Sequence, residues 1–215
     1  MNPFPIILSA PSGGGKTTIT KLLLARREDV GYSVSCTTRA PRNGEAHGRD
    51  YFFVSKAEFT ARSGRGEFAE FAEVHGNWYG TLRSQVDHVL AQNRHVIMDI
   101  DVQGAAQFRA AYPESVTIFL MPPSAEVLLS RLTGRNTESI EAYRTRIRGA
   151  REELRAAVSY QYAVVNDDLE ATYDLVSSII DAEAVRHARQ PHLTEKVAAL
   201  VEELDRQLVQ LTASV

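Results

Sequence analysis

The sequence predicts an α/β fold in which a parallel β-sheet carries helices on both faces. Short apolar runs of strand length alternate with segments of helical periodicity along most of the chain. Ile6–Leu8, Val96–Asp101 and Val116–Met121 are the clearest strands, because strands buried on both faces read as near-continuous apolar runs. Strands that alternate with helices pack as a parallel sheet between two helical layers. Residues from about Val34 to Gly80 break the alternation and predict an inserted, mostly antiparallel lobe.

The first strand runs directly into a glycine-rich turn, residues 10–17, which reads APSGGGKT and is called the phosphate loop below. Glycines let successive backbone N–H groups turn toward one anion, and the helix that follows adds its unpaired N–H groups. Lys16 can then reach the β- and γ-phosphates, while the Thr17 hydroxyl can bind Mg²⁺. The residues expected to bind ATP are Ala10, Pro11, Ser12, Gly13, Gly14, Gly15, Lys16, Thr17 and Thr18.

One position in the phosphate loop departs from the usual pattern, since Ala10 stands where the first glycine is expected. Alanine tolerates most backbone conformations near the end of a strand. An ordinary glycine-rich turn is the alternative interpretation. The placement of Gly-Lys-Thr before a helix favours a nucleoside triphosphate site.

Length and composition are those of one globular domain with a short extension. The chain has 215 residues, of which 44% are hydrophobic and 24% charged, and its net charge of −3 argues against a nucleic-acid-binding protein. Cys36 is the only cysteine, so an internal disulfide is impossible, which fits a reducing compartment. The sequence has no signal-peptide pattern and no apolar run of the roughly 20 residues that cross a bilayer. We expect a cytoplasmic protein that binds neither nucleic acid nor membranes.

The inserted lobe is defined by strand patterns and one helix cap. Its predicted strands are Gly31–Thr38, Tyr51–Val54 and Glu67–Val74. Ser55 is expected to cap a helix that starts at Lys56, with Glu58 completing a capping box. Asn77–Thr81 is predicted to be a turn.

The second half of the chain returns to alternating helices and strands. A strand, Ala163–Val165, is predicted between two long helices, and Ser124 is expected to cap an earlier one. The predicted helices are Arg83–Gln92, Ser124 to about Arg131, about Ser139 to Ser159, and Leu169 to about Arg189.

Pro191 marks a boundary, after which one apolar stripe follows the spacing of a helix. The stripe can pack onto its own domain, which is the arrangement we favour, or form a short coiled-coil contact with another subunit. Its residues are Leu193, Val197, Leu200, Leu204, Leu208 and Leu211.

Taken together, these segments resemble the guanylate kinase family over nearly the whole chain, to about Arg186. A phosphate loop alone identifies only a superfamily, whereas the ordered set of segments is specific. The segments are APSGGGKT (10–17), SVSCTTRAPR (33–42), GRDYFF (48–53), EFAE (67–70), GNWYGT (76–81), DIDVQG (99–104), RLTGR (131–135) and VNDD (165–168).

The resemblance implies a three-layer P-loop NTPase fold for residues 4–186. Its core would comprise residues 4–33 and 82–186, with a GMP-binding lobe at about 34–81 and a short helical lid at about 131–150. Residues 187–215 would form a C-terminal helical extension.

The resemblance also implies the reaction ATP + GMP → ADP + GDP with Mg²⁺, and with dGMP as a further acceptor, in purine nucleotide salvage and GMP recycling. The residues that match GMP-binding positions of the family are Ser35, Arg39, Arg42, Tyr51, Glu70, Tyr79, Thr81 and Asp101. The residues expected to act in catalysis are Lys16, Arg131, Arg135, Arg146 and Asp99, with Thr17 as the Mg²⁺ ligand. Asp99 is expected to orient Mg²⁺-bound water or the arginines and Asp101 to face guanine, although the reverse division also fits.

The chemistry of these residue types suits the roles that the resemblance implies. Guanine presents donors at N1 and at its 2-amino group, so the Glu70 carboxylate can accept from both, whereas adenine leaves it unpaired. Arginine forks and tyrosine hydroxyls can hold a phosphate dianion by charge-assisted hydrogen bonds. Taken singly, each of these residues would be an ordinary surface charge or packing group. Their order beside the phosphate loop favours the functional interpretation.

Two other functions fit parts of the pattern. Guanylate-kinase-like domains of scaffold proteins bind phosphorylated peptides without catalysis, but they tend to have damaged phosphate loops, and this one is intact. A kinase for another nucleoside monophosphate is the second alternative. Glu70, Thr81 and Asp101 favour guanine.

Overall fold

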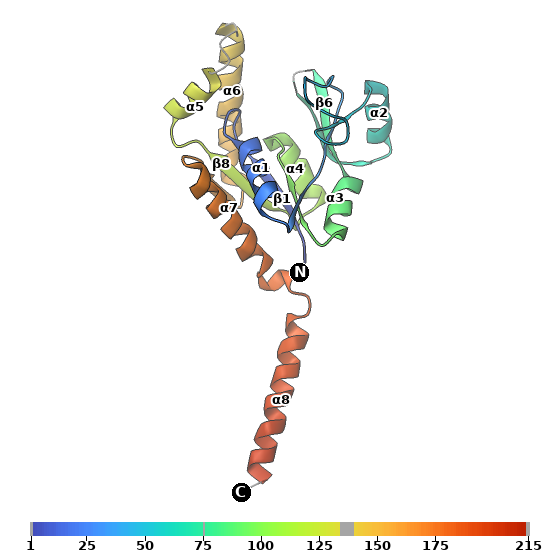
Figure 1. Cartoon of the computed structure of the whole chain (residues 1–215), viewed down its shortest axis with the longest axis vertical. Helices are drawn as coiled ribbons and strands as arrows, with labels where there is room; N and C mark the ends of the chain where they lie inside the picture. Colours follow the sequence, from blue (N-terminus) through green and yellow to red (C-terminus); the bar gives the residue numbers. More distant parts are fainter. Residues whose placement is uncertain (1, 75, 134–139, 214–215) are drawn as a thin grey trace.

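A five-stranded parallel sheet forms the centre of the protein, in a computed structural model that describes residues 2–74, 76–133 and 140–213 (Figure 1). Its strand order is β2-β7-β1-β8-β9, and each neighbouring pair runs parallel. The strands are β1 (Pro5–Ser9), β2 (Val30–Tyr32), β7 (His95–Met98), β8 (Val116–Met121) and β9 (Tyr162–Val165). Strand β1 is buried along its whole length, as the apolar run predicts.

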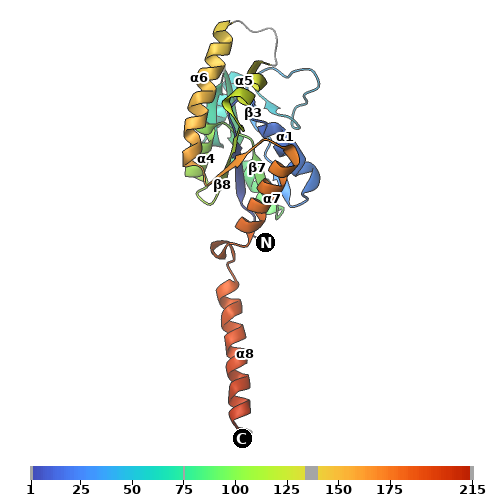
Figure 2. The same cartoon turned by 90° about the vertical axis from the view of Figure 1, so that its left-hand side faces the viewer.

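Helices cover both faces of this sheet, which confirms the predicted three layers. Helices α1 (Lys16–Arg26) and α7 (Leu169–Ala184) pack on one face, and α4 (Val102–Ala111) lies on the other (Figure 2). Helix α3 (Arg83–Ala91) packs on the same face as α4. The buried side chains are Ile19, Leu23, Val176 and Ile180 on the first face, and Val86, Val89, Ala105 and Phe108 on the second.

The inserted lobe contains a second sheet of order β4-β3-β6-β5. Strand β3 pairs antiparallel with β6 but parallel with β4, so the sheet is mixed. Helix α2 (Lys56–Gly64) covers it through Phe59, whose ring stacks on Phe68 at 4.4 Å between centroids. The strands are β3 (Cys36–Thr37), β4 (Phe52–Phe53), β5 (Phe68–Val74) and β6 (Asn77–Leu82).

Two predicted boundaries in the lobe are wrong. The single strand expected at Gly31–Thr38 is divided between β2 of the core sheet and β3 of the lobe, because the chain crosses from one sheet to the other here. The expected turn at Asn77–Thr81 is strand β6, whose aromatic and β-branched residues pair with β5. The reversal instead includes Gly76, which has a φ of 76°.

Capping residues behave largely as predicted. Ser55 accepts from the Glu58 N–H at 3.1 Å and starts α2. The Glu58 carboxylate, which was expected to complete a capping box, forms an ion pair with Arg62 at 2.7 Å. Ser124 accepts from the Val127 N–H at 3.2 Å and starts helix α5.

Helices α5 (Ala125–Thr133) and α6 (Ile140–Ala156) form a hairpin that packs through Leu128, Leu132 and Ala150. The hairpin and the lobe stand on opposite sides of the sheet at the same end of the molecule (Figure 1). Part of the segment expected to form the lid, residues 134–139, lies outside the described residues.

Helix α8 (Leu193–Ala213) extends away from the opposite end of the domain (Figures 1 and 2). The favoured prediction that its stripe packs onto the domain is therefore wrong. Five of the stripe's side chains are 49–66% exposed: Val197, Leu200, Leu204, Leu208 and Leu211. Among residues 2–74, 76–133 and 140–213, no helix has the length and apolarity needed to cross a membrane.

Candidate active site

The phosphate loop joins β1 to α1 at the carboxyl edge of the parallel sheet. Gly13 and Gly15 have φ values of 79° and 87°, in the left-handed region that favours glycine. A Cβ on Gly14 would lie 2.7 Å from the Ala10 Cβ and 2.8 Å from the Pro11 carbonyl oxygen. The three glycines are therefore required by the backbone path, while the buried Ala10 fits the place of the usual first glycine.

Asn166, directly after β9, holds the phosphate loop in position. Its Nδ2 donates to the Gly14 carbonyl at 2.8 Å, and its Oδ1 accepts from the Thr172 hydroxyl at 3.1 Å. Arg131 donates to the Asn166 carbonyl at 3.3 Å. No role was predicted for Asn166 from the sequence. Its position, polar and immediately after a strand at the ligand-binding edge of the sheet, was the available signal.

A cavity of about 210 Å³ lies between the phosphate loop and the lobe. Because Lys16 and Glu70 both line it, one cavity joins the expected triphosphate site to the expected guanine site. It includes seven of the predicted site residues, namely Lys16, Ser35, Tyr51, Glu70, Tyr79, Asp99 and Asp101.

Glu70 is a buried carboxylate at the lobe side of this cavity, and it is only 6% exposed. Its Oε1 accepts from the Thr81 hydroxyl at 2.6 Å. Burial, together with the nearby charge of Asp101, raises the pKa of Glu70 to about 7, even though the Thr81 hydrogen bond acts in the opposite direction. The cavity thus presents a carboxyl group that burial makes more basic than an ordinary glutamate.

Asp99 lies between the phosphate loop and β2. Its Oδ1 accepts from the Tyr32 hydroxyl at 2.7 Å, and its Oδ2 accepts from the Thr17 hydroxyl at 3.2 Å. Burial, with the neighbouring Asp99 charge, raises the pKa of Tyr32, so the phenol keeps its proton and donates. Tyr32 orients Asp99, a role that was not predicted because Tyr32 has the sequence pattern of an ordinary strand residue.

Asp101 is a helix-capping residue, unlike Asp99. Its Oδ1 caps α4 by accepting from the backbone N–H groups of Gln103 and Gly104 at 2.9 and 2.8 Å. Asp99 contacts Thr17 of the phosphate loop, whereas Asp101 neighbours Glu70.

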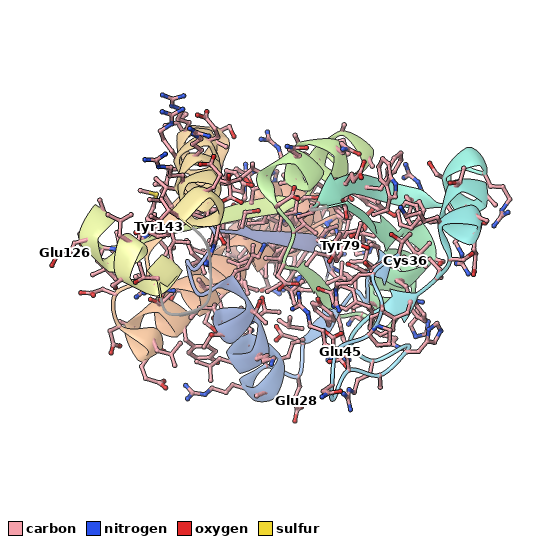
Figure 3. All side chains as sticks on the ribbon, turned by 90° about the horizontal axis from the view of Figure 1, so that it is seen from above. Glu28, Cys36, Glu45, Tyr79, Glu126 and Tyr143 are labelled. Atoms are coloured by element: carbon pink, nitrogen blue, oxygen red, sulfur yellow. The ribbon has the colours of Figure 1, made fainter. Side chains whose placement is uncertain are left out.

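Arg39 is paired within the lobe, and its partners Glu45 and Tyr79 are labelled there in Figure 3. The Arg39 guanidinium contacts the Glu45 carboxylate at 2.9 Å, donates to the Tyr79 hydroxyl at 3.3 Å, and lies 5.5 Å from the centroid of the Tyr51 ring. The hydrogen bonds that Arg39 donates to the Glu45 carboxylate raise the pKa of Arg39 above its ordinary value. Arg42 is exposed, and its backbone N–H donates to the same Glu45 carboxylate at 2.7 Å.

Two more of the predicted arginines, Arg131 and Arg146, lie on helices α5 and α6. Arg131 lies beside the phosphate loop. A Cβ placed on Gly13 would be 3.5 Å from the Cβ of Arg131. Arg146 donates to the Leu132 carbonyl at 2.8 Å, which ties α6 to α5. Arg135 lies outside the described residues. Neither Arg131 nor Arg146 is among the residues that line the cavity.

The site suits a magnesium ion that is held mainly by a nucleotide. Mg²⁺ is usually bound through one or two carboxylates together with substrate phosphates and water. Thr17 and Asp99 supply one hydroxyl and one carboxylate at the loop. Within the part of the chain that the structure describes, no cluster of three or more carboxylate, histidine or cysteine side chains could bind a metal without a nucleotide.

The fold and the cavity define a nucleoside monophosphate kinase of the P-loop class, because a phosphate loop faces an inserted lobe across a shared pocket. The sequence pattern of the guanylate kinase family matches residues 2–183, and the chain belongs to that family.

Individual proteins that are similar to this chain are guanylate kinases as well. The guanylate kinase of Symbiobacterium thermophilum is 46% identical over 199 residues, which is 93% of this chain and 92% of the relative. That of Anaeromyxobacter dehalogenans is 48% identical over 185 residues, covering 85% and 82% of the two chains. The crystal structure of guanylate kinase from Anaplasma phagocytophilum superimposes with a TM-score of 0.73 at 36% identity, covering 90% and 92%. The chain is an ATP:GMP phosphotransferase.

Proposed function

We propose that GMP binds in the cavity with its base against Glu70 and its phosphate against Arg39, Arg42, Tyr51 and Tyr79, while the phosphate loop holds ATP. The observation that carries this assignment is that Lys16 of the loop and Glu70 of the lobe line one cavity. The GMP phosphate would compete with Glu45 for Arg39, because both are anions that suit the same guanidinium.

On the guanine side, Glu70 accepts from N1–H and the 2-amino group. Thr81 donates its one hydroxyl proton to Oε1 of that carboxylate, so it serves guanine O6 or N7 only if it leaves Glu70. Ser35, which also lines the cavity, is the other partner for O6 or N7. Asp101 completes this side by placing the first turn of α4 against Glu70.

On the ATP side, Lys16, Arg131, Arg135 and Arg146 neutralise charge on the transferring phosphoryl group. Phosphoryl transfer needs alignment and charge stabilisation more than covalent chemistry, so no general base is required. Thr17 would bind Mg²⁺ directly, and Asp99, oriented by Tyr32, would hold its water. When bound there, Mg²⁺ would supply neutralisation of the negative charge on the nucleotide phosphates.

Lys16→Ala tests the separation of the two sides. We expect kcat to fall by about 10²–10³-fold or more, because a transition-state charge contact is lost. GMP binding by calorimetry should remain largely intact, because the lobe provides the base and phosphate contacts. Lys21→Ala, an exposed lysine on the same helix, is the matched control and should keep wild-type kcat. Loss of GMP binding in Lys16→Ala would contradict the assignment.

The proposed binding sites for ATP and GMP also divide the chain into functional parts. Residues 4–33 and 82–186 act as the core, about 34–81 as the GMP lobe and about 131–150 as the lid, with 187–215 as a separate extension. The reaction is assigned to the cytoplasm, which the buried, unpaired Cys36 suits.

The extension would join two copies of the chain through α8. Its exposed stripe repeats every 11 residues, since Leu193, Val197 and Leu200 are followed at that interval by Leu204, Leu208 and Leu211. An 11-residue repeat keeps one apolar face in register over a helix pair with little or right-handed supercoiling. A contiguous exposed apolar face of this kind favours a partner helix with the same stripe.

A further inference from the structure

The backbone of α4 approaches the Glu70 carboxylate at Gly104. A Cβ placed on Gly104 would lie 2.6 Å from Glu70 Oε2 and 3.2 Å from its Cδ. Carbon and oxygen atoms that are not bonded do not pack at 2.6 Å, so a side chain on Gly104 and the observed position of the carboxylate exclude each other.

Neither α4 nor β5 can easily move to make room. Asp101 caps α4 through the Gly104 N–H at 2.8 Å. One turn further on, the Gln107 side chain donates to the Phe71 carbonyl at 3.0 Å and accepts from the Phe71 N–H at 3.2 Å. These two hydrogen bonds clamp α4 to β5 at the residue that follows Glu70. If a side chain is added at Gly104, the Glu70 carboxylate therefore has to move, because the two backbones cannot.

The observed carboxylate position is also the one that Thr81 holds. The Thr81 hydroxyl donates to Oε1 at 2.6 Å while Oε2 faces Gly104, so the two oxygens are set from opposite sides. A shift of Oε2 away from α4 must turn the group and weaken the Thr81 contact.

We propose that Gly104 is a specificity-determining positioning residue, whose missing side chain lets the Glu70 carboxylate stand where it accepts from both N1–H and the 2-amino group of guanine. The inference rests on the proposed role of Glu70. Gly104 does not touch the nucleotide; it acts through Glu70. The atom that a methyl group would displace is the end of a flexible side chain, so Gly104→Ala leaves the backbone in place and alters recognition.

The test compares GMP with IMP, which lacks the 2-amino group. In Gly104→Ala, KM for GMP should rise by about 10- to 100-fold, the loss expected for a misaligned hydrogen bond to a charged group, while kcat changes little. The ratio of kcat/KM for GMP to that for IMP should fall toward the ratio of Glu70→Gln. Gly64→Ala is the matched control, since Gly64 also lies in a helix and a Cβ there meets no atom within 4 Å.

A double-mutant cycle is the second test of the coupling between Gly104 and Glu70. Aspartate is one methylene shorter than glutamate, so in the Glu70→Asp background the added methyl group has room. There Gly104→Ala should change KM for GMP by less than about twofold, because the coupling between the two positions is already broken. Thermal unfolding of each variant checks that it is folded.

The outcomes separate the two levels of inference. If Glu70→Gln lowers the GMP-to-IMP ratio but Gly104→Ala does not, the role of Gly104 is overturned and that of Glu70 stands. If neither lowers it, the assignment of Glu70 is wrong as well. If Gly104→Ala is unfolded in both backgrounds, Gly104 has a purely structural role and the proposal is overturned.

Discussion

Glu70 illustrates how a single residue combines function with a cost in stability. Its carboxyl group has an ordinary pKa of 4.5, and burial raises the pKa to about 7 in the folded protein. Between these values the folded protein binds more protons than the unfolded chain. The unliganded protein therefore loses stability as the pH rises from 4.5 through 7, because a charge forms at a buried position.

Replacing this carboxylate should stabilise the unliganded protein. Glu70→Gln is expected to raise the free energy of unfolding at pH 8 by on the order of 2–3 kcal/mol, and by much less at pH 5, where wild-type Glu70 is already protonated. Chemical denaturation at both pH values measures this. Glu73→Gln, on the same strand but exposed, should show no such difference.

The same variant should discriminate less between GMP and AMP, because an amide offers guanine only one acceptor oxygen. An assay of ADP release with each nucleotide measures this. Unchanged discrimination would show that another residue reads the base.

At the scale of single elements, α8 carries a stripe of apolar side chains that its own domain leaves uncovered. We expect the full chain to dimerise through it. Leu204→Glu should convert the dimer to a monomer in sedimentation velocity, because it places a charge in the middle of the stripe.

The control for this prediction lies on the same helix. Val209 is 69% exposed and, at 100° per residue, faces away from the stripe. Val209→Glu adds the same charge and should leave the dimer intact. A wild-type chain that sediments as a monomer at every concentration would refute the dimer, and equal kcat in both variants is expected because α8 is remote from the cavity.

At the scale of the whole molecule, the lobe and the α5–α6 hairpin stand on either side of the phosphate loop (Figure 1). Water must be kept from the γ-phosphate until GMP is aligned, so we expect the two to approach each other when both nucleotides bind. Small-angle scattering should show compaction with a bisubstrate nucleotide, and no compaction would count against closure.

Spin labels can localise this motion. Lys56→Cys on α2 and Arg148→Cys on α6 place labels at exposed positions of the lobe and the hairpin, and their separation should shorten on binding. The native Cys36 should not compete, since it is buried and burial raises its pKa to about 11. Labels at Gln92 and Ser178, both on the core, should keep their distance.

Several features were predictable because they depend on residues close together in the chain. The strand–APSGGGKT–helix order specifies the phosphate loop, since positive φ at Gly13 and Gly15 and the helix N-terminus are local properties. Apolar runs specify the buried strands, and Ser55 and Ser124 specify helix starts. The family resemblance and the α/β class follow from the order of such segments.

Other features depend on contacts between distant segments, so only the tertiary structure decided them. Tyr32 meets Asp99 because β2 and β7 pair, Asn166 reaches Gly14 because β9 ends beside the loop, and Gly104 matters because α4 packs on β5. Pairing with β5 also makes a strand of the segment predicted to be a turn. A sequence states which residues are polar or small, but the free energy of a hydrogen bond or of a close contact depends on what the fold places opposite them.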